Sequence, residues 1–414
     1  MQENRVVVTG LGIVSPVGND IATFWNALIT GKSGVGPITL FDASAFDARI
    51  AAEVKTFNPE NYGINKKEAR RMEKFIQFAI AAAKQAIEGA GLDLEKENKE
   101  RLGVVVGSGI GSLRIMEEEH SVLLKSGPGR ITPFLIPMLI VNEAAGHVGM
   151  HFGFKGPNTC ITTACASGTH SVGEALRIIQ RGDADLMIAG GTESCITPLG
   201  IGGFCALKAL STRNDAPEKA SRPFDAERNG FVMGEGCGLA VLESLDHARK
   251  RGAKIIAEVT GFGMSCDAYH LTSPDPEGYG ASLAMSWALK DSKINPEDVT
   301  YINAHGTSTK LNDKVETLAV KKSFGNSSKT VMVSSTKSVT GHLLGAAGGI
   351  EFIACCLAIR DNIVPPTINY EFRDPECDLD YVPNKARECE VNVCMSNSLG
   401  FGGHNASIML KKFK

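Results

Sequence analysis

The stretch Arg5-Val6-Val7-Val8-Thr9-Gly10-Leu11-Gly12 recurs in outline as Lys254-Ile255-Ile256-Ala257-Glu258-Val259-Thr260-Gly261-Phe262-Gly263. Each copy joins a short apolar run, typical of a buried strand, to a turn that contains glycine. Each copy also opens one part of the 414-residue chain. The repetition predicts two related halves, and we place the boundary near Arg251, so that the halves are residues 1–251 and 252–414.

The two predicted halves also end alike. Residues 230–242 form a glycine-rich loop that leads into an apolar run, and residues 400–410 repeat this arrangement. Between these ends, strand-like runs alternate with helical patterns, which indicates a layered α/β fold. Examples are the strand-like runs 104–106 and 186–189 and the helical patterns 76–90 and 281–289.

One cysteine, Cys165, lies among small residues in the stretch TTACASG (162–168). Apolar residues then recur with helical spacing from Val172 to Ile179, so a helix is expected to begin close to Cys165. Unpaired N–H groups at a helix start favour negative charge, and we therefore expect the thiol pKa to be lowered. A packed, unreactive thiol is the alternative for this segment taken alone.

Two histidines follow strand-like runs and lie among Gly, Ser and Thr residues. His305 comes after the apolar run 299–302, and His342 comes soon after the run 331–333. Either histidine alone is compatible with a purely structural role. Together with Cys165 they form a nucleophile-plus-base set, which favours catalysis.

Four motifs, in this order, resemble the signature of the beta-ketoacyl-acyl-carrier-protein synthases. They are TACASGTHS with Cys165, NAHGTSTKLND with His305, STKSVTGHLLGAAG with Lys337 and His342, and NSLGFGGHN with Phe401. Connecting segments such as GDADLMIAGGTES and RNGFVMGEGCG are similar to the long-chain synthase II branch more than to its relatives. The resemblance implies an α/β protein of the thiolase fold, with two pseudo-symmetric halves in an α/β/α/β/α sandwich, normally a homodimer.

The resemblance also implies fatty acid elongation. Cys165 would take a medium-to-long acyl chain from an acyl carrier protein, and decarboxylative Claisen condensation with malonyl carrier protein would give 3-oxoacyl carrier protein and CO₂. N–H groups of His305 and His342 would stabilise the enolate. The backbone N–H groups of Cys165 and Phe401 would form the oxyanion hole, and Phe401 would also be a gate. Phosphopantetheine arrives on the carrier protein, so neither a cofactor nor a metal is expected.

Acidic residues are expected to support the histidines. The resemblance implies that Lys337 pairs with Glu351 and organises the local charges rather than acting as a base, since a buried unpaired lysine is costly. Asp313 and Glu316 lie three residues apart beyond His305, so they are expected to share a helical face and to orient the site. Ordinary surface carboxylates remain the alternative for these two.

Substrate contacts are implied in the same way. Thr307 and Thr309 match residues that hydrogen-bond the phosphopantetheine arm, and Ile110 matches a position that lines the acyl pocket. A basic surface would receive the acidic carrier protein, although such a charge cluster is also typical of a solvated face. The residues expected to form this docking surface are Lys66, Lys67, Arg70, Arg71, Lys74, Arg130 and Lys208.

Composition is compatible with this prediction. The net charge of −3 gives no reason to expect nucleic acid or an anionic membrane as a partner. Eleven cysteines without a C-x-x-C pair argue against a disulfide framework and a zinc site, and indicate reduced thiols. The first strand-like run follows Met1 almost directly and no apolar membrane span is visible, so we expect a cytoplasmic protein.

Four alternatives remain open. A synthase I-type enzyme shares the same chemistry with another acyl preference. A degradative thiolase would carry a second cysteine in a C-x-G motif. A noncatalytic chain-length subunit would lack Cys165. A nucleotide-dependent oxidoreductase would need a complete glycine loop, but Ser15 replaces its third glycine. Leu399, His404 and Glu143 depart from the family's usual residues, which puts acyl specificity in question rather than the reaction type.

Overall fold

The computed structural model describes residues 4–414, so Met1 and the two residues after it lie outside the described part. The first half of the chain supplies β1 (Val6–Val14), β4 (Leu102–Gly107), β5 (Asn158–Thr159), β6 (Leu186–Glu193) and β7 (Gly236–Ser244). These strands lie in the order β1-β7-β6-β4-β5. β4 is parallel to β5 and β6, whereas β7 is antiparallel to β6 and β1.

The second half repeats this pattern. It supplies β8 (Ala257–Cys266), β9 (Tyr301–Asn303), β10 (Met332–Ser334), β13 (Val393–Gly400) and β14 (His404–Lys411), in the order β8-β14-β13-β9-β10. β9 is parallel to β10 and β13, and β14 is antiparallel to β13 and β8. The two halves therefore share one topology, as the repeated stretch predicted.

The two repeated strands meet at the centre of the molecule. Val6 to Val8 of β1 pair antiparallel with residues 257–259 of β8, which joins the two halves into one ten-stranded sheet. Arg251 lies between α9 (Leu245–Lys250) and β8. The sheet continues through this pairing without a break at the boundary. The division into residues 1–251 and 252–414 therefore stays a prediction.

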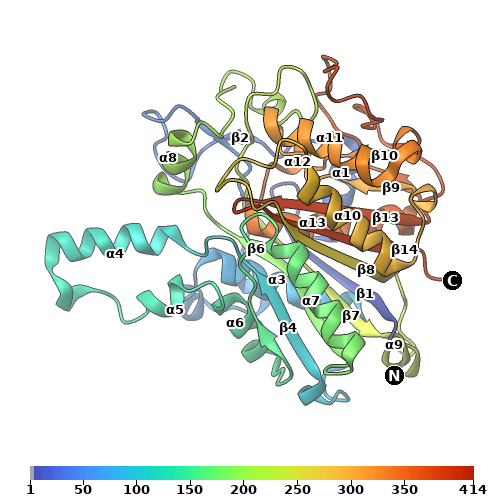
Figure 1. Cartoon of the computed structure of the whole chain (residues 1–414). Helices are drawn as coiled ribbons and strands as arrows, with labels where there is room; N and C mark the ends of the chain where they lie inside the picture. Colours follow the sequence, from blue (N-terminus) through green and yellow to red (C-terminus); the bar gives the residue numbers. More distant parts are fainter. Residues whose placement is uncertain (1–3) are drawn as a thin grey trace.

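Helices cover the sheet on both sides and fill the space between its two halves (Figure 1). α3 (Lys74–Gly89) packs on β1 and β7, and α10 (Tyr279–Ser292) packs on β8 and β14. α7 (Ser167–Arg181) and α13 (Ala347–Asp361) contact strands of both halves and each other. They form the middle layer of an α/β/α/β/α arrangement, which explains why α13 is buried on nearly every side.

Glycines allow the two middle helices to approach closely. A Cβ atom on Gly168 of α7 would lie 2.7 Å from the backbone nitrogen of Gly349 in α13, and one on Gly348 would lie 2.2 Å from Thr169 Oγ1. Side chains at these positions would push the helices apart. The contact matters for function because Cys165 lies just before α7 and His342 lies just before α13.

An arm extends from the body of the first half (Figure 1). It consists of α4 (Leu113–Ser126), the short 3-10 helix η3 (Pro128–Arg130) and α5 (Leu135–Leu139), and α6 (Glu143–Phe152) returns the chain to the body. The remaining helices are α1 (Ile21–Thr30), α2 (Lys66–Ala69), α8 (Pro198–Ala206), α11 (Lys310–Phe324) and α12 (Lys337–Thr340). Two-residue strands complete the fold: β2 (Gly36–Pro37), β3 (Ile50–Ala51), β11 (Ile363–Val364) and β12 (Arg387–Glu388).

None of the helices described between residues 4 and 414 combines the length and the apolar character needed to cross a lipid bilayer.

Candidate active site

Cys165 lies in a tight turn that leads into α7. Ala164, just before it, has a φ of +50°, a left-handed conformation that is uncommon for a residue with a side chain. The Ser167 hydroxyl holds this turn, because Oγ accepts from the Thr163 N–H at 2.9 Å and donates to the Ala164 carbonyl at 2.6 Å. The strained turn directs the thiol of Cys165 toward the second half of the molecule.

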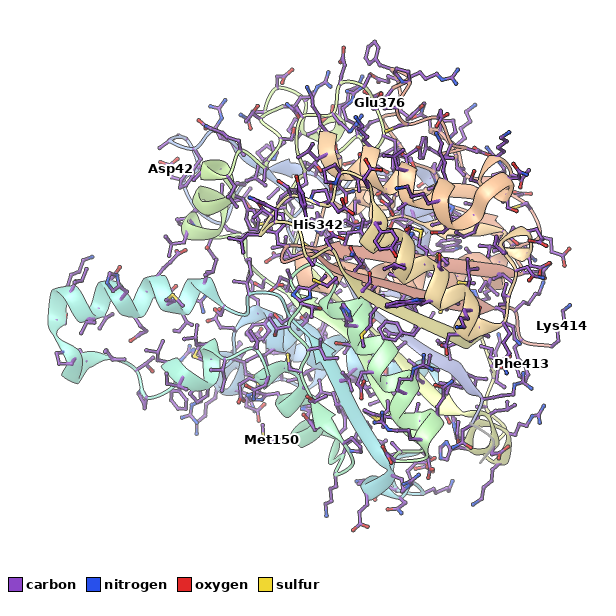
Figure 2. The ribbon with its side chains drawn as sticks, viewed as in Figure 1. Asp42, Met150, His342, Glu376, Phe413 and Lys414 are labelled. Atoms are coloured by element: carbon purple, nitrogen blue, oxygen red, sulfur yellow. The ribbon has the colours of Figure 1, made fainter. Side chains whose placement is uncertain are left out.

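Both histidines reach the thiol from the second half. His342 Nε2 lies 3.1 Å from Cys165 Sγ, and the ring of His305 stands nearly perpendicular to that of His342 with centroids 5.3 Å apart. β9 and β10 are parallel neighbours, so the loops that follow them leave the same edge of the sheet. Figure 2 shows His342 near the middle of the molecule. The structure thus brings Cys165, His305 and His342 together.

The pKa of the Cys165 thiol is not lowered as the helix start predicted. Burial raises it to about 12, although the charge of Lys337 acts in the opposite direction. Loss of solvent around the thiol is the largest contribution, and it exceeds the lowering by Lys337 and by the Phe401 N–H. Burial, with a smaller contribution from Lys337, also holds the pKa of His305 and His342 well below the usual range. At neutral pH the thiol and both imidazoles are therefore uncharged.

Phe401 approaches Cys165 through its backbone. Its N–H lies close enough to the Cys165 sulfur to favour the thiolate. The approach depends on Gly400, where a Cβ atom would lie 2.7 Å from the Thr163 carbonyl oxygen. The Phe401 ring lies 6.3 Å from that of Phe204, between centroids. A residue with a side chain at position 400 would move the Phe401 N–H away from the thiol.

Lys337 of α12 and Glu351 of α13 form a buried ion pair near the two histidines. Each side chain is only 1% exposed, so the pair is excluded from water. Two opposite charges in such a place stabilise each other only while both are present. The pairing that the sequence resemblance implied is therefore present in the structure.

Glu351→Gln is expected to lower the free energy of unfolding by about 3–5 kcal/mol, because it leaves the Lys337 charge buried without a partner. The matched control is Asp361→Asn, which breaks the more exposed Arg360–Asp361 pair and should cost less than about 1 kcal/mol. Chemical denaturation of both variants measures the two losses. Equal losses would contradict a stabilising role for the buried pair.

Glu316 and Asp313 of α11 turn to different neighbours. Glu316 accepts from the backbone N–H groups of His305 and Gly306, both at 2.8 Å, so it positions the His305 loop. Asp313 instead accepts from the Phe224 N–H at 2.8 Å and lies 3.6 Å from Arg228 Nε. That Asp313 also orients the histidine site stays a prediction. Residues three apart on a helix differ by roughly 60° in direction, enough to separate the two contacts.

Burial raises the pKa of Glu316 to about 7, although its two N–H donors act in the opposite direction. A carboxyl group whose pKa is higher in the folded chain binds its proton more tightly there, so the folded state loses stability as pH rises from about 4.5 to about 7. Glu316→Gln should remove this loss. Denaturation across that interval should show a steeper decrease for the wild type, and parallel pH profiles would contradict the assignment.

A cavity of about 490 Å³ leads from the three site residues to the surface. Thr307 and Thr309 line it, with their hydroxyl oxygens 2.9 Å apart. Ile110 lies elsewhere, packed against the apolar cluster that also contains Cys165. Several lining residues had no signal in the sequence that marked them as part of a site. They include Phe204, Asn229, Phe231 and Lys310.

The three unusual residues lie in different surroundings. Leu399 lines the cavity beside Phe401. The ring of His404 lies next to Gly402, where an added Cβ atom would be 3.1 Å from it. Glu143 lies 3.7 Å from His147 on α6, outside the cavity lining. Two of the three departures are therefore close to the predicted gate.

The predicted basic docking residues do not line the cavity as one group. Lys208 alone among the seven is part of the lining, and it pairs with Asp47 at 3.0 Å. Lys74 is half-buried, and its ammonium group forms an ion pair with the buried carboxylate of Glu235 at 3.6 Å. Arg130 lies in η3 of the arm. The four other cations are exposed on α2 or directly after it: Lys66, Lys67, Arg70 and Arg71.

Glu193, which no sequence motif singled out, is a buried carboxylate at the end of β6. It accepts from Ser108 Oγ at 2.9 Å and from the N–H groups of Gly109 and Gly345 at 2.7 and 3.0 Å. Glu193 therefore ties the loop that carries Ile110 to the loop that follows His342. Its one local signal was a carboxylate at the end of the otherwise apolar run LMIAGGTE.

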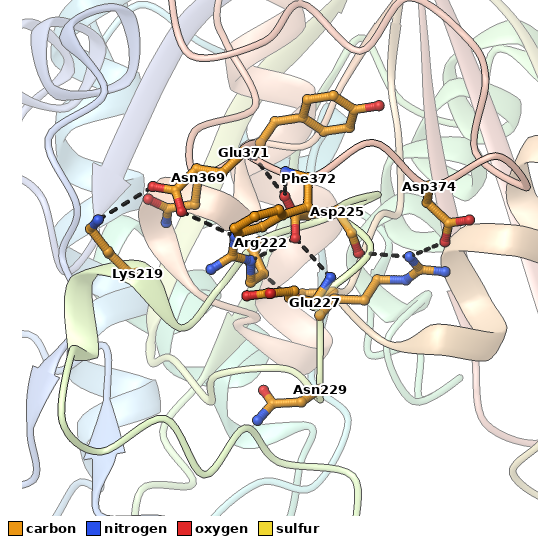
Figure 3. A network of polar contacts seen from close by, with 12 residues as sticks. Lys219, Arg222, Asp225, Glu227, Asn229, Asn369, Glu371, Phe372 and Asp374 are labelled. Atoms are coloured by element: carbon orange, nitrogen blue, oxygen red, sulfur yellow. Dashed lines mark hydrogen bonds and ion pairs between the residues drawn. The ribbon is translucent and has the colours of Figure 1, made fainter.

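A second polar network includes Arg222, Asp225 and Asp374 (Figure 3), and it contacts the Thr307–Thr309 loop where the Arg222 N–H donates to Ser308 Oγ at 2.9 Å. Arg228 Nε donates to the Thr309 carbonyl at 3.1 Å, and its Nη2 donates to the Lys310 carbonyl at 3.1 Å. Asp374, 2.6 Å from Nη1, balances the charge of Arg228. The network fixes the backbone of the loop that places Thr307 and Thr309 in the cavity lining.

The duplicated α/β fold and the site between its halves can be compared with known protein families. The model "Beta-ketoacyl synthase, N-terminal domain" matches residues 3–248, and "Beta-ketoacyl synthase, C-terminal domain" matches residues 256–371. The chain belongs to the beta-ketoacyl synthase family.

Relatives narrow this class further. The chain is 55% identical over 412 residues to the 3-oxoacyl-[acyl-carrier-protein] synthase 2 of Coxiella burnetii, and 52% identical over 414 residues to the protein of the same name from a Synechocystis species. Each match covers 100% of this chain and 99% of the relative. The predicted family and its synthase II branch are confirmed.

Solved structures agree. A beta-ketoacyl synthase from Burkholderia phymatum superposes with a TM-score of 0.92 at 34% identity, covering 99% of this chain and all of that one. A type II polyketide ketosynthase assembly, solved as a complex of acyl-carrier protein and ketosynthase, gives a TM-score of 0.93 at 37% identity over the whole of both chains. The predicted thiolase fold is confirmed.

Proposed function

We propose that this protein elongates fatty acids as a 3-oxoacyl-acyl-carrier-protein synthase of the second type. The observation that carries the proposal is the 3.1 Å contact between Cys165 Sγ and His342 Nε2, with His305 beside it at the inner end of the cavity. A thiol, two uncharged imidazoles and a donor N–H from Phe401 are the groups that acyl transfer followed by decarboxylation needs.

In the first step, an acyl chain moves from its carrier protein to the enzyme. The Cys165 sulfur bonds to the acyl carbonyl carbon, and the carbon–sulfur bond to the carrier breaks. Because the thiol is uncharged at rest, its proton must leave during the attack, and His342 is placed to pass it to the departing carrier sulfur. The N–H groups of Cys165 and Phe401 stabilise the oxyanion that forms on the way.

In the second step, malonyl carrier protein enters. Its carbon–carboxylate bond breaks, CO₂ leaves, and the electron pair forms an enolate on the thioester. Uncharged imidazoles still carry one N–H each, so His305 and His342 stabilise this oxygen by hydrogen bonds. The enolate carbon then bonds to the acyl carbon, the bond to Cys165 breaks, and the released thiolate takes a proton from water. The product is 3-oxoacyl carrier protein.

Carrier protein is the partner in this scheme, and one structural relative was solved in complex with its own acyl-carrier protein. The pantetheine arm would enter along Thr307 and Thr309, and Lys208 at the cavity would meet the acidic carrier. The enzyme itself then needs no cofactor, because phosphopantetheine arrives with each substrate. A cytoplasmic location, where carrier-bound chains are made, is part of this proposal.

A homodimer is also part of the proposal. The arm and the adjoining helix expose large apolar side chains: Leu124 is 73% exposed, Ile136 59% and Met150 68%. Figure 2 shows Met150 on the outside of the molecule. Burial of such a surface by a second copy would stabilise the assembly. Light scattering should give twice the chain mass, and a monomer at micromolar concentration would argue against the dimer.

Acyl carrier proteins of graded chain length, supplied with and without malonyl carrier protein, test the function. We expect intact-mass spectrometry to show an adduct of one acyl chain on the Cys165 peptide, with medium and long chains preferred. Addition of malonyl carrier protein should discharge the adduct and yield 3-oxoacyl product. Absence of any adduct would indicate a noncatalytic subunit, and adducts restricted to short chains would contradict the long-chain assignment.

A further inference from the structure

We propose that Cys165, His305 and His342 also form a binding site for a divalent transition metal ion such as Zn²⁺, and that the bound ion reversibly blocks the enzyme. One thiol and two imidazoles place their donor atoms within 4.8 Å of one another. Zinc prefers sulfur and nitrogen donors in tetrahedral geometry, and three protein ligands leave a fourth position for water. This function is distinct from condensation and would oppose it.

The site is both enclosed and reachable. All three residues line the inner end of the cavity that opens to the surface, which supplies an entry path and room for a water ligand. His305 Nδ1 and His342 Nδ1 are buried without a hydrogen-bond partner, so no competing contact locks either ring. Metal-binding histidines usually have such an outer partner, and its lack predicts weaker binding than at a dedicated zinc centre. A chelator should therefore remove the ion.

The buried charges near the site are already paired or hydrogen-bonded. Glu351 pairs with Lys337, and Glu193 accepts from the backbone N–H groups of Gly109 and Gly345. A divalent ion bound to the Cys165 sulfur would stabilise the thiolate directly.

Binding requires one proton to leave. The Sγ–H bond of Cys165 breaks, its proton passes to solvent, and the sulfur electron pair forms the bond to the metal. The histidines contribute lone pairs without net proton loss. The expected stoichiometry is one proton released for each ion bound. No single sequence motif contains all three ligands, because they come from separate segments that meet only in the fold.

Co²⁺ is a suitable probe because its spectrum reports its ligands. Titration of the full-length protein should give tetrahedral visible bands and a thiolate-to-cobalt band in the near ultraviolet, saturating at one ion per chain. Zn²⁺ should displace the cobalt and inhibit condensation, and a chelator should restore activity. Prior alkylation of Cys165 in the wild-type protein should abolish both spectral features without any substitution.

Variants locate the ion. Cys165→Ala should lose the thiolate band, and His305→Ala should weaken binding by at least about tenfold, the smallest effect expected for a lost outer partner. Cys266→Ala is the matched control because Cys266 is the exposed cysteine among the described residues. A band that survives in Cys165→Ala and disappears in Cys266→Ala would identify surface binding and overturn the proposal.

The outcome is separable from that of the proposed function. An acyl adduct on Cys165 without a cobalt–thiolate band would refute only the metal site. A cobalt–thiolate band without any adduct would refute only acyl transfer.

Discussion

Cys165→Ala is expected to abolish acyl transfer and to lower condensation by at least about 10⁴-fold, because no other group can carry the acyl chain. The fold should persist, since alanine fits the small space that Cys165 occupies in its turn. Intact-mass spectrometry after incubation with acyl carrier protein should show no adduct. Thermal unfolding should give a midpoint close to that of the wild type.

A second cysteine provides the control. Cys389 is half-buried and contacts Met332 on another part of the molecule, so Cys389→Ala should keep both the adduct and the activity. Unchanged condensation in Cys165→Ala, with the control also active, would show that the chain has some other nucleophile. That result would end the proposed mechanism.

His305→Ala has the second-largest expected effect. Loss of one donor to the enolate should slow decarboxylation and condensation by about 10²–10³-fold. Formation of the acyl adduct should remain, because the contact to the Cys165 sulfur is made by His342. Rapid-quench measurement of the adduct and assay of CO₂ release separate the two steps.

His342→Ala sharpens this test. His342 contacts the thiol directly, so its loss should slow the acyl transfer as well as the decarboxylation. If both variants slowed both steps to the same extent, the two histidines would not have the separate roles assigned to them. Normal CO₂ release in His305→Ala would contradict its role at the enolate.

Much of the fold was predictable from local patterns. The repeated stretches became β1 and β8, and the apolar runs before the histidines became β9 and β10. The helical spacing after Cys165 became α7, which begins at Ser167. These elements follow from side-chain periodicity, which depends only on neighbours in the sequence. Motifs at the ends of these elements likewise identified Cys165, His305 and His342 as candidates.

Contacts between distant segments were not predictable in this way. The proximity of Lys74 to Glu235 and the contact of Asp313 with the Phe224 N–H join residues that no local pattern connects. Glu193 was missed because its hydrogen-bond donors come from two other segments. In each case the partner is far away in sequence.

The amino-acid sequence by itself determined the duplicated α/β plan, the family and the three reactive side chains, because these depend on spacing and residue type. Only the tertiary structure decided the charge state of the site. Enclosure between the two halves raises the pKa of Cys165 and lowers those of both histidines, reversing the expectation from the helix start. The physical reason is that desolvation depends on everything packed around a group, whereas a helix start is a feature of its neighbours along the chain.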